Sequence, residues 1–283
     1  MYLLINGGLG NQLFQLAYAN YISETQSKKV FLVPQNVSGN NRDFLLKIFL
    51  EQFPNLTIER IPKRLSIPIS IKKHLPTSVS KLKAFKTLDP IFSYPSAYAF
   101  EPVSGSAVQF GYFQSKNLLT GANSNLASIF SDSLERCYPD SAFRDKFILH
   151  IRGGDLHQYR ESMGILDVDY YSRALERMDV DPSQCIALTD DLNHAKSIVD
   201  QIGITSIIGP QDMDALESFA LMAFSKKLVC ANSTFSWWAG VISKNRGGMV
   251  YHPKPWFLNW EEDPGDSFDY PGFEVIPSSF YHE

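Results

Sequence analysis

The chain has 283 residues, of which 44% are hydrophobic and 20% are charged, and its formal net charge is −4. This composition is typical of a soluble globular protein and argues against long disorder, and the length favours two lobes or one large α/β domain. The longest N-terminal apolar run, MYLLI, is far shorter than the roughly 18 residues of a membrane-spanning helix, and no basic segment precedes it. We therefore expect a cytoplasmic protein.

The N-terminal half begins as an α/β unit in which a strand, a glycine turn and an amphipathic helix follow one another. Repeated prolines break the pattern from the end of the second strand to about residue 100, and we predict no elements there. The predicted elements of this half are strands at residues 2–6, 29–34 and 106–113 and a helix at residues 11–25.

A basic segment lies within this half. Residues 59–88 contain eight lysines and arginines and one acidic residue, so they carry +8 − 1 = +7, and the rest of the chain carries −11. One interpretation is a solvated surface. The alternative is that residues 60–86 contact the inner face of a membrane, where each basic side chain contributes about 1 kcal/mol. Nucleic acid is disfavoured, because the segment offers one aromatic side chain, Phe85, for base stacking.

The C-terminal half alternates short apolar runs with helical patterns, which predicts right-handed crossovers and a parallel sheet covered on both faces. Ligands of such a Rossmann-like sheet lie beyond the C-terminal ends of its strands. We place the domain boundary between residues 142 and 143, giving domains 1–142 and 143–283. The predicted strands are 147–151, 185–188, 205–208, 227–231 and 249–252, and the predicted helices are 169–178, 192–203, 213–226 and 236–244.

Three cysteines, Cys137, Cys185 and Cys230, lie far apart and form no CxxC pair. An odd number of separated cysteines fits reduced, mostly buried thiols better than disulfides or a zinc site. We expect no metal site from them.

The first strand of the C-terminal half ends in chemically active residues, since FILHI is followed by RGGD. This places His150 and Arg152 where a nucleotide would bind. The planar guanidinium of arginine matches two phosphate oxygens at once, and Gly153 and Gly154 allow the backbone to approach a ligand closely. An arginine that is only ion-paired at a strand end is the alternative.

Two further strand ends have similar chemistry. In NSTFSWWAG, Ser233, Thr234 and Ser236 precede or begin a helix, whose N-terminus is suited to an anion. The alternative is an ordinary helix cap with Trp237 and Trp238 in the core. Together with the RGGD end and the TDD end that follows Leu188, this makes three such ends on neighbouring strands of one sheet. Three of them favour a nucleotide site over three unrelated turns.

The third end is TDD, where Asp190 or Asp191 could accept hydrogen bonds from a guanine edge or a ribose hydroxyl. Capping of the following helix is an equally good explanation.

Two other motifs are discounted. GGLGNQ lacks the third glycine of a dinucleotide fingerprint, and no acidic residue follows the next strand. Asp167 and Asp169 form a DxD, but they open a helix, so N-capping explains them better than metal binding. We expect chemistry that needs no metal.

Five blocks together resemble the bacterial α-1,2-fucosyltransferases of glycosyltransferase family 11, and they follow the family's order along nearly the whole chain. The resemblance implies a GT-B-like α/β fold with two Rossmann-like domains facing a central cleft. It also implies a C-terminal domain that binds GDP-fucose, an N-terminal domain that binds the acceptor, and inversion at the fucose C1 atom without a metal or other cofactor. The blocks are GGLGNQLFQLAYA (7–19), GYFQSK (111–116), HIRGGD (150–155), TDDLNHAK (189–196) and NSTFSWWAG (232–240).

The resemblance also implies roles for individual residues. His150, Arg152 and Asp155 match the HxRRxD motif, whose first arginine contacts the donor diphosphate, whereas Gly153 replaces the usual second arginine. The remaining donor contacts that it implies are Asn11 and Gln12 near the donor sugar, Asp190 or Asp191 at the guanosine, and Ser233, Thr234, Phe235 and Ser236 at the β-phosphate.

Elementary chemistry agrees with these roles. The departing GDP gains negative charge, and in the absence of a divalent cation Arg152 and the helix N-terminus must stabilise it. The acceptor hydroxyl attacks an oxocarbenium-like fucose, and a base must take its proton. Our candidates for the base are Asp155 first, then Glu161 or His157.

The sequence therefore predicts transfer of L-fucose from GDP-fucose to the 2-hydroxyl of a galactose in a surface-glycan precursor of the O-antigen kind. A lipid-linked acceptor would explain the basic segment. Two alternatives remain, another GT-B nucleotide-sugar transferase and a non-catalytic protein that binds nucleotides or glycans.

Overall fold

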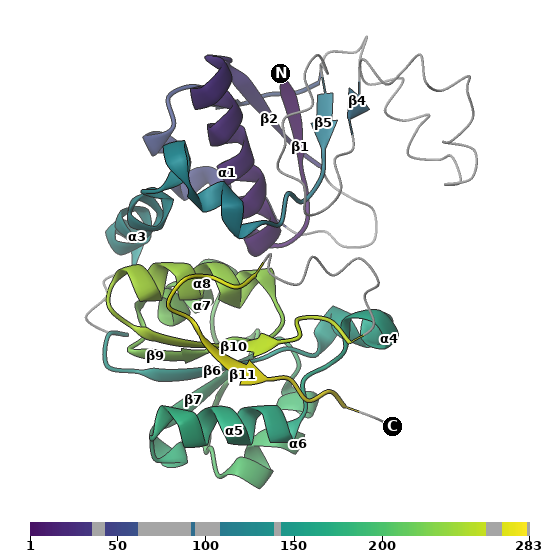
Figure 1. The fold of residues 1–283 in the computed structure, drawn as a ribbon, viewed down its shortest axis with the longest axis vertical. Helices are drawn as coiled ribbons and strands as arrows, with labels where there is room; N and C mark the ends of the chain where they lie inside the picture. The colour runs from purple at the N-terminus through teal and green to yellow at the C-terminus, as the bar shows by residue number, and fades with distance from the viewer. Residues whose placement is uncertain (36–42, 62–91, 94–107, 139–142, 259–267, 282–283) are drawn as a thin grey trace. The chain divides into compact units, whose positions relative to one another are not determined.

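The computed structural model describes residues 1–35, 43–61, 92–93, 108–138, 143–258 and 268–281, so most of the basic segment 60–86 lies outside the described residues. By internal contacts the chain divides into two compact units, Met1–Leu126 and Ala127–Glu283, and each is described by itself. Both are α/β units built on a parallel sheet, as predicted (Figure 1). The expected central cleft concerns the placement of one unit against the other and stays a prediction.

The first unit contains a five-stranded parallel sheet with the order β3-β2-β1-β5-β4. The long helix α1 (Leu9–Gln26) packs against β1, β2 and β3. Short 3-10 turns at Leu46–Ile48, Leu50–Gln52, Lys116–Leu119 and Gly121–Asn123 complete the described part. The strands are β1 (Tyr2–Ile5), β2 (Val30–Pro34), β3 (Leu56–Ile58), β4 (Phe92–Ser93) and β5 (Val108–Phe110).

The second unit contains a six-stranded parallel sheet with the order β11-β10-β9-β6-β7-β8. The chain begins at β6, runs outward through β7 and β8, and then crosses to β9 on the other side of β6. This is the strand order of a dinucleotide-binding Rossmann fold. The strands are β6 (Phe147–Ile151), β7 (Cys185–Thr189), β8 (Ser206–Ile208), β9 (Lys227–Val229), β10 (Met249–Lys254) and β11 (Glu274–Pro277).

Helices cover both faces of this second sheet. Figure 1 shows α5 and α6 on one face and α7 and α8 on the other. Because parallel strands are buried on both faces, β6 is an almost continuous apolar run that contributes Leu149 and Ile151 to the core beneath α5 and α6. The helices are α5 (Val168–Met178), α6 (Leu192–Ile202), α7 (Ala215–Phe224), α8 (Thr234–Asn245) and the short α4 (Arg160–Met163), with 3-10 turns at Gly154–Tyr159 (η7) and Pro182–Gln184 (η8).

Helix α3 (Leu126–Cys137) is the main difference from the predicted organisation, because no element was predicted for these residues. The unit boundary falls at Leu126, earlier than residue 142, since α3 packs with the second unit. The Phe130 and Trp238 ring centroids lie 5.4 Å apart, and the Arg246 guanidinium donates to Ser131 Oγ at 2.8 Å. Strand β11 was also missed, and so were β3 and β4, which lie in the stretch where the prolines led us to predict no elements. The other predicted strands and helices of the second unit are confirmed within a few residues.

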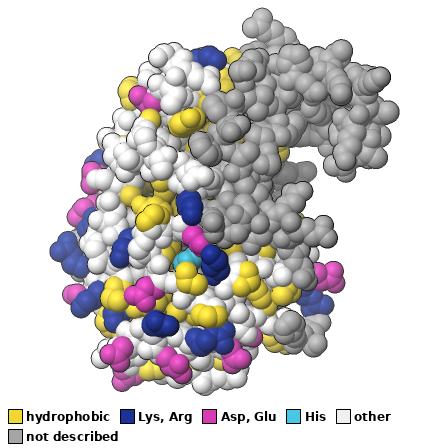
Figure 2. All heavy atoms as spheres, viewed as in Figure 1, with side chains coloured by type: hydrophobic (Ala, Val, Ile, Leu, Met, Phe, Trp, Pro, Cys, Tyr) yellow, Lys and Arg dark blue, Asp and Glu magenta, His cyan; other side chains and the backbone are white. Residues whose placement is uncertain are grey.

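The surface carries mixed charge where it is described. On the face shown in Figure 2, Lys and Arg side chains lie among Asp and Glu side chains over the coloured atoms. None of the helices in the described ranges has the length and apolar character needed to cross a membrane.

Candidate functional site

Three predicted segments meet at one edge of the second sheet. Strand β6 pairs with β7 on one side and with β9 on the other, so the residues that follow these strands are neighbours. The strands β6, β7 and β8 follow one another toward one edge of the sheet, whereas β9, β10 and β11 follow one another toward the other edge. The strand order therefore reverses between β6 and β9, and ligands of open α/β sheets bind at such a switch point. Arg152, Asp190 and Ser233 therefore share the edge where a nucleotide is expected.

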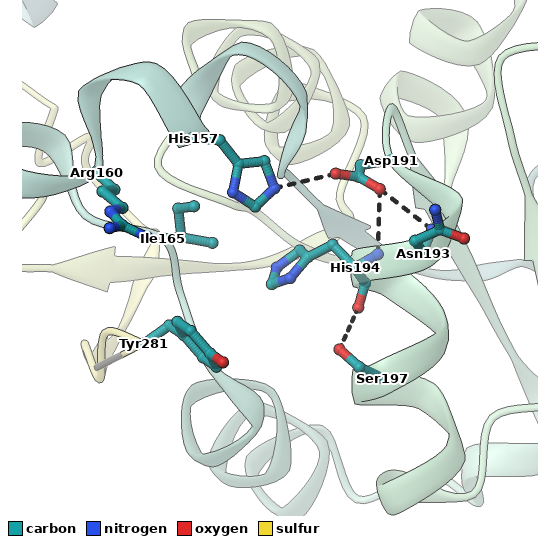
Figure 3. A pocket seen from close by; sticks show the side chains of 8 residues that line it. All are labelled: His157, Arg160, Ile165, Asp191, Asn193, His194, Ser197 and Tyr281. Carbon is teal, nitrogen blue, oxygen red and sulfur yellow. Dashed lines mark hydrogen bonds and ion pairs between the residues drawn. The ribbon is translucent and has the colours of Figure 1, made fainter. Parts of the chain in front are cut away.

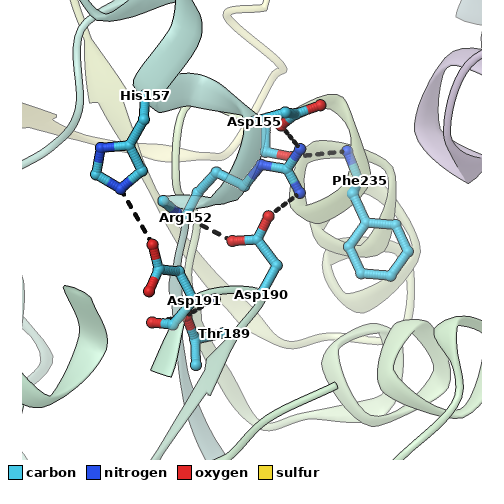
Figure 4. Close-up of polar contacts among 9 residues, drawn as sticks. Arg152, Asp155, His157, Thr189, Asp190, Asp191 and Phe235 are labelled. Atoms are coloured by element: carbon cyan, nitrogen blue, oxygen red, sulfur yellow. Dashed lines mark hydrogen bonds and ion pairs between the residues drawn. The ribbon is translucent and has the colours of Figure 1, made fainter. Parts of the chain in front are cut away.

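Arg152 is held there by two carboxylates. Its Nη1 lies 2.7 Å from Asp190 Oδ2, and its Nη2 is paired with Asp155 Oδ1. Asp190 also accepts a 3.0 Å hydrogen bond from the Gly153 amide through Oδ1. Figure 4 shows the guanidinium between the two aspartates, on the side of Phe235 in the first turn of α8. Only 16% of the Arg152 side chain is exposed, so its orientation is fixed before any ligand arrives.

The positions of Asp191 and Asp190 require glycine at the two residues after Arg152. A Cβ atom on Gly153 would lie 2.9 Å from both Cβ and Oδ2 of Asp191, and one on Gly154 would lie 2.2 Å from Asp190 Oδ2. Gly154 also has φ +33°, a conformation that L side chains rarely adopt. The space in which the family's second arginine would begin is therefore filled by Asp191.

Asp191 has two tasks in the structure. Its Oδ1 caps α6 by accepting from the amides of Asn193 and His194, both at 3.1 Å, and its Oδ2 lies 3.0 Å from His157 Nε2. Burial alone would raise the pKa of this carboxyl, but the hydrogen bonds from His194 and His157 outweigh it, so the pKa is lowered. Asp191 is thus a charged acceptor at the start of a helix, and the capping alternative is confirmed for it.

A cavity of about 330 Å³ opens beside Asp191 (Figure 3). Burial lowers the pKa of the His194 imidazole, and Asp191 only partly opposes this shift. The Nε2 atom of His194 is buried and makes no hydrogen bond to any described residue. The cavity therefore combines flat rings, a carboxylate and neutral donors, a mixture suited to a nucleoside. It is lined by His157, Arg160, Ile165, Asp191, Asn193, His194, Ser197 and Tyr281.

His150 is 3% exposed and lies on the β6 face that α8 covers. Its ring centroid is 5.9 Å from that of Phe235. Burial, together with the positive charge of Arg152, lowers the pKa of His150 to about 3, so the imidazole is neutral at physiological pH. Its Nδ1 is buried without a hydrogen-bond partner among the described residues. The strand end thus presents one fixed positive charge, on Arg152, beside a neutral ring.

The start of α8 has an ordinary helix cap, which was the alternative to an anion site. Ser233 Oγ accepts from the Phe235 amide at 3.4 Å, and the buried Ser236 hydroxyl donates to the Ala231 carbonyl at 3.3 Å. Trp237 and Trp238 are fully buried. Ser236 therefore supports the turn, and the groups of this helix start that lie nearer the surface are Ser233, Thr234 and Phe235.

The two residues expected near the donor sugar lie in the first unit and differ in accessibility. Gln12 is 2% exposed, donates to the Gly7 and Asp43 carbonyls at 2.9 and 2.8 Å, and accepts from the Leu45 amide at 3.0 Å. Its amide holds a loop in place. Asn11 is half-buried, and its Oδ1 accepts from Gln114 Nε2 at 2.8 Å.

The remaining predicted residues are the acids Asp167, Asp169 and Glu161. Asp167 caps α5 by accepting from the Asp169 and Tyr170 amides, so the helix-cap interpretation of this DxD is confirmed. Glu161 lies in α4, next to the cavity residue Arg160. Among the described residues, no group of three or more histidines, cysteines and acids is arranged to hold a metal ion.

Sequence reasoning missed two residues that support this edge. The Asn232 side chain is 3% exposed and donates to the Met163 and Gly164 carbonyls at 3.1 Å, which ties the β9 end to the segment after α4. The Tyr171 hydroxyl donates to the His150 carbonyl at 3.0 Å. Asn232 stands in the NSTF motif, which was a usable signal, whereas Tyr171 is one of several aromatic residues in α5.

The profile of Glycosyl transferase family 11 matches residues 1–257 of the chain. The chain belongs to this family. Two family relatives from Escherichia coli are similar over nearly their whole length. O-antigen biosynthesis glycosyltransferase WbnK is 28% identical, over 91% of this chain and 95% of the relative, and an alpha-1,2-colitosyltransferase is 23% identical, over 93% of each. The expected family is therefore confirmed, and the protein is a glycosyltransferase.

Among solved structures, fucosyltransferase NodZ from Bradyrhizobium aligns with 84% of this family 11 chain and 92% of its own, with a TM-score of 0.46 and 13% identity. The α/β fold class of this chain follows from its own two parallel sheets.

Proposed function

We propose that this family 11 enzyme transfers L-fucose from GDP-fucose to the 2-hydroxyl of a galactose, with inversion at C1 and without a metal ion. The observation that carries the proposal is Arg152, fixed by Asp155 and Asp190 at the switch point of a Rossmann-like sheet. The name of one relative, O-antigen biosynthesis glycosyltransferase WbnK, supports an acceptor in O-antigen biosynthesis.

In this proposal Arg152 stabilises the leaving diphosphate. Negative charge accumulates on the β-phosphate as the bond to fucose breaks, and a preorganised cation stabilises it without further rearrangement. Each Nη atom carries two hydrogens and uses one on an aspartate, so the guanidinium keeps donors for phosphate oxygens. Beside it, the α8 N-terminus with Ser233, Thr234 and Phe235 adds the Ser233 hydroxyl as a donor and the positive end of the helix dipole.

The cavity beside Asp191 receives the guanosine in this proposal, because an acidic residue at the end of the second strand is where Rossmann folds bind ribose or base. Asp191 Oδ2 accepts one hydrogen bond from His157, and a carboxylate oxygen can accept a second from the nucleoside. Asp190 and His150 lie outside the lining of this cavity, and in this proposal they act at the diphosphate end of the site, where Asp190 holds the Arg152 guanidinium.

The candidates for the base that removes the acceptor proton are Asp155, His157 and Glu161. Asp155 is ion-paired with Arg152, so we propose that it acts by positioning that guanidinium. His157 is half exposed and is oriented by Asp191, as in a carboxylate–histidine pair that serves as a general base. If His157 is the base, His157→Gln should lower kcat far more than it changes KM, whereas Glu161→Gln should leave kcat near the wild-type value.

The decisive assay measures GDP release with Arg152→Ala and Arg152→Lys. Loss of one preorganised donor lowers the rate by about a hundred- to a thousandfold. A variant that keeps more than about a tenth of the wild-type rate would contradict the diphosphate role. NMR of the product made from a galactoside gives its linkage and anomeric configuration, and full turnover in EDTA is expected. Loss of turnover in EDTA would refute the metal-independent mechanism.

A second donor is favoured by one observation, the colitosyltransferase among the relatives. Thermal shift with a panel of nucleotide sugars separates the two, because the true donor stabilises the protein by RT ln(1 + [L]/Kd). Stabilisation by GDP-fucose without any transfer would instead favour a non-catalytic binding protein.

A lipid-linked acceptor and contact with the inner face of the membrane through residues 60–86 rest on the composition of that segment. Vesicle flotation with and without anionic lipid tests the contact, and indifference to lipid charge would remove it.

A further inference from the structure

The GYFQSK block lies at an edge of the first unit's sheet where a second ligand could bind. It directly follows β5, which pairs with β1, and the strand order β3-β2-β1-β5-β4 places the reversal of the sheet between these two strands. The C-terminal ends of β1 and β5 are therefore the position where an α/β sheet binds a ligand. None of the donor roles above uses the GYFQSK residues.

A strained turn builds this edge. Phe113 has φ +53°, a conformation that is rare for a bulky residue, and yet it is fully buried. Its ring stacks on that of Tyr18 with centroids 3.8 Å apart and planes 4° from parallel. Strained backbone that the surrounding packing holds in place is concentrated at functional sites. With Phe113 anchored inward, its neighbour Tyr112 is 37% exposed.

Amide side chains from both strand ends brace the same turn. Gln15 Nε2 donates to the Gly111 carbonyl at 2.9 Å and to Asn6 Oδ1 at 2.8 Å. Gln114 Nε2 donates to Asn11 Oδ1 at 2.8 Å, which fixes the orientation of the Gln114 amide. The amide of Gln114 also has a second Nε2 hydrogen and the Oε1 atom, which are the donor and acceptor types that sugar hydroxyls require.

We infer that Tyr112 and Gln114 form a binding site for the acceptor sugar, with Asn11 as the residue that positions Gln114. An exposed aromatic ring packs on the apolar face of a pyranose, and a fixed amide selects the orientation of its hydroxyls. The inference rests on the proposed function, since it assigns the acceptor of that transfer to this edge of the first unit.

Steady-state kinetics with the full-length chain, GDP-fucose and lactose tests the inference. Tyr112→Ala and Gln114→Ala should each raise the KM for lactose by at least about tenfold and leave the KM for GDP-fucose within about twofold. Tyr112→Phe keeps the ring and should stay near wild type. Glu24→Ala, exposed near the other end of α1, is the control for an unrelated surface change.

An unchanged KM for lactose in Tyr112→Ala would overturn the inference, and so would an equal rise in the KM for GDP-fucose. Saturation-transfer NMR with lactose in the presence of GDP measures binding without turnover. A lactose signal in the wild type that Tyr112→Ala loses supports the site even if no fucose is transferred, in which case the proposed function alone fails. The same signal in both proteins, or none in the wild type, refutes the site.

Discussion

Replacing Gly153 with alanine tests whether Asp191 dictates the glycine that departs from the family motif. The new Cβ would lie 2.9 Å from both Cβ and Oδ2 of Asp191, closer than real Cβ contacts. The φ of −127° at Gly153 is negative, but its ψ of −86° lies outside the helical and extended regions, so the effect of the clash must be separated from that of the backbone. Either the loop or Asp191 must move.

The cost follows from what Asp191 does. If it moves, α6 loses the cap that accepts from the Asn193 and His194 amides, which costs about 0.5–2 kcal/mol. Its bond to the half-exposed His157 adds little, since exposed ion pairs contribute roughly 0–1 kcal/mol. We expect Gly153→Ala to destabilise the protein by about 1–2 kcal/mol, or to lower Tm by roughly 2–8 °C. Gly153→Arg begins with the same Cβ and should cost no less.

Thermal unfolding followed by circular dichroism, combined with a double-mutant cycle, isolates the cause. Asp191→Gly removes the colliding atoms, and glycine at an N-cap costs only about a few tenths of a kcal/mol. In that background Gly153→Ala should cost at least about 1 kcal/mol less than in the wild type, so the two changes are strongly coupled. Equal costs of Gly153→Ala in both backgrounds would refute the steric explanation.

Three further changes have defined outcomes. Gln12→Ala removes three buried hydrogen bonds and should lower the free energy of unfolding by about 2–4 kcal/mol, and an unchanged urea midpoint would contradict this. Asn232→Ala leaves the Met163 and Gly164 carbonyls without their donor and should cost about 2–3 kcal/mol in the same assay, whereas Asn232→Asp adding no cost would disprove the donor role. Burial lowers the pKa of His252 to about 4, below its unfolded value of about 6.5, so its neutral form contributes stability that is lost as pH falls from about 6.5 to 4. His252→Asn should therefore flatten the fall in unfolding free energy over that pH range by up to about 3 kcal/mol, and an unaltered slope would exclude the histidine as its source.

The sequence predicted the second unit well because its signals are local. Continuous apolar runs such as FILHI identify strands buried on both faces, and the parallel sheet then places their polar ends together. Arg152 and Asp190 lie 38 positions apart, but both follow neighbouring strands, so their proximity could be predicted without coordinates.

What could not be predicted depends on contacts between distant residues. Nothing local to Gly153 indicates that Asp191 fills its side-chain space, and nothing local to Gln12 indicates that its amide is used by residues 43–45. Helix α3 was missed because the polar stretch TGANSN precedes it and its second half, SDSLERC, is largely polar, although its buried Phe130 and Leu134 show helical spacing.

The charges around Arg152 at first argue against an anion site, since Asp155 and Asp190 together outweigh the guanidinium. Two features of the geometry resolve this. The carboxylates engage one hydrogen on each Nη and leave the remaining donors in a fixed fork, so a diphosphate meets a cation that loses no further freedom on binding. At the neighbouring strand end the Ser233 hydroxyl can donate a hydrogen bond and α8 presents the positive end of its dipole, and the aspartates neutralise neither. A lysine at position 152 would have three donors on a flexible stem and, held by two carboxylates, would retain one. The same pair of aspartates that orients an arginine would therefore leave a lysine almost no donors, so we expect Arg152→Lys to lose most of the proposed diphosphate stabilisation although it keeps the positive charge.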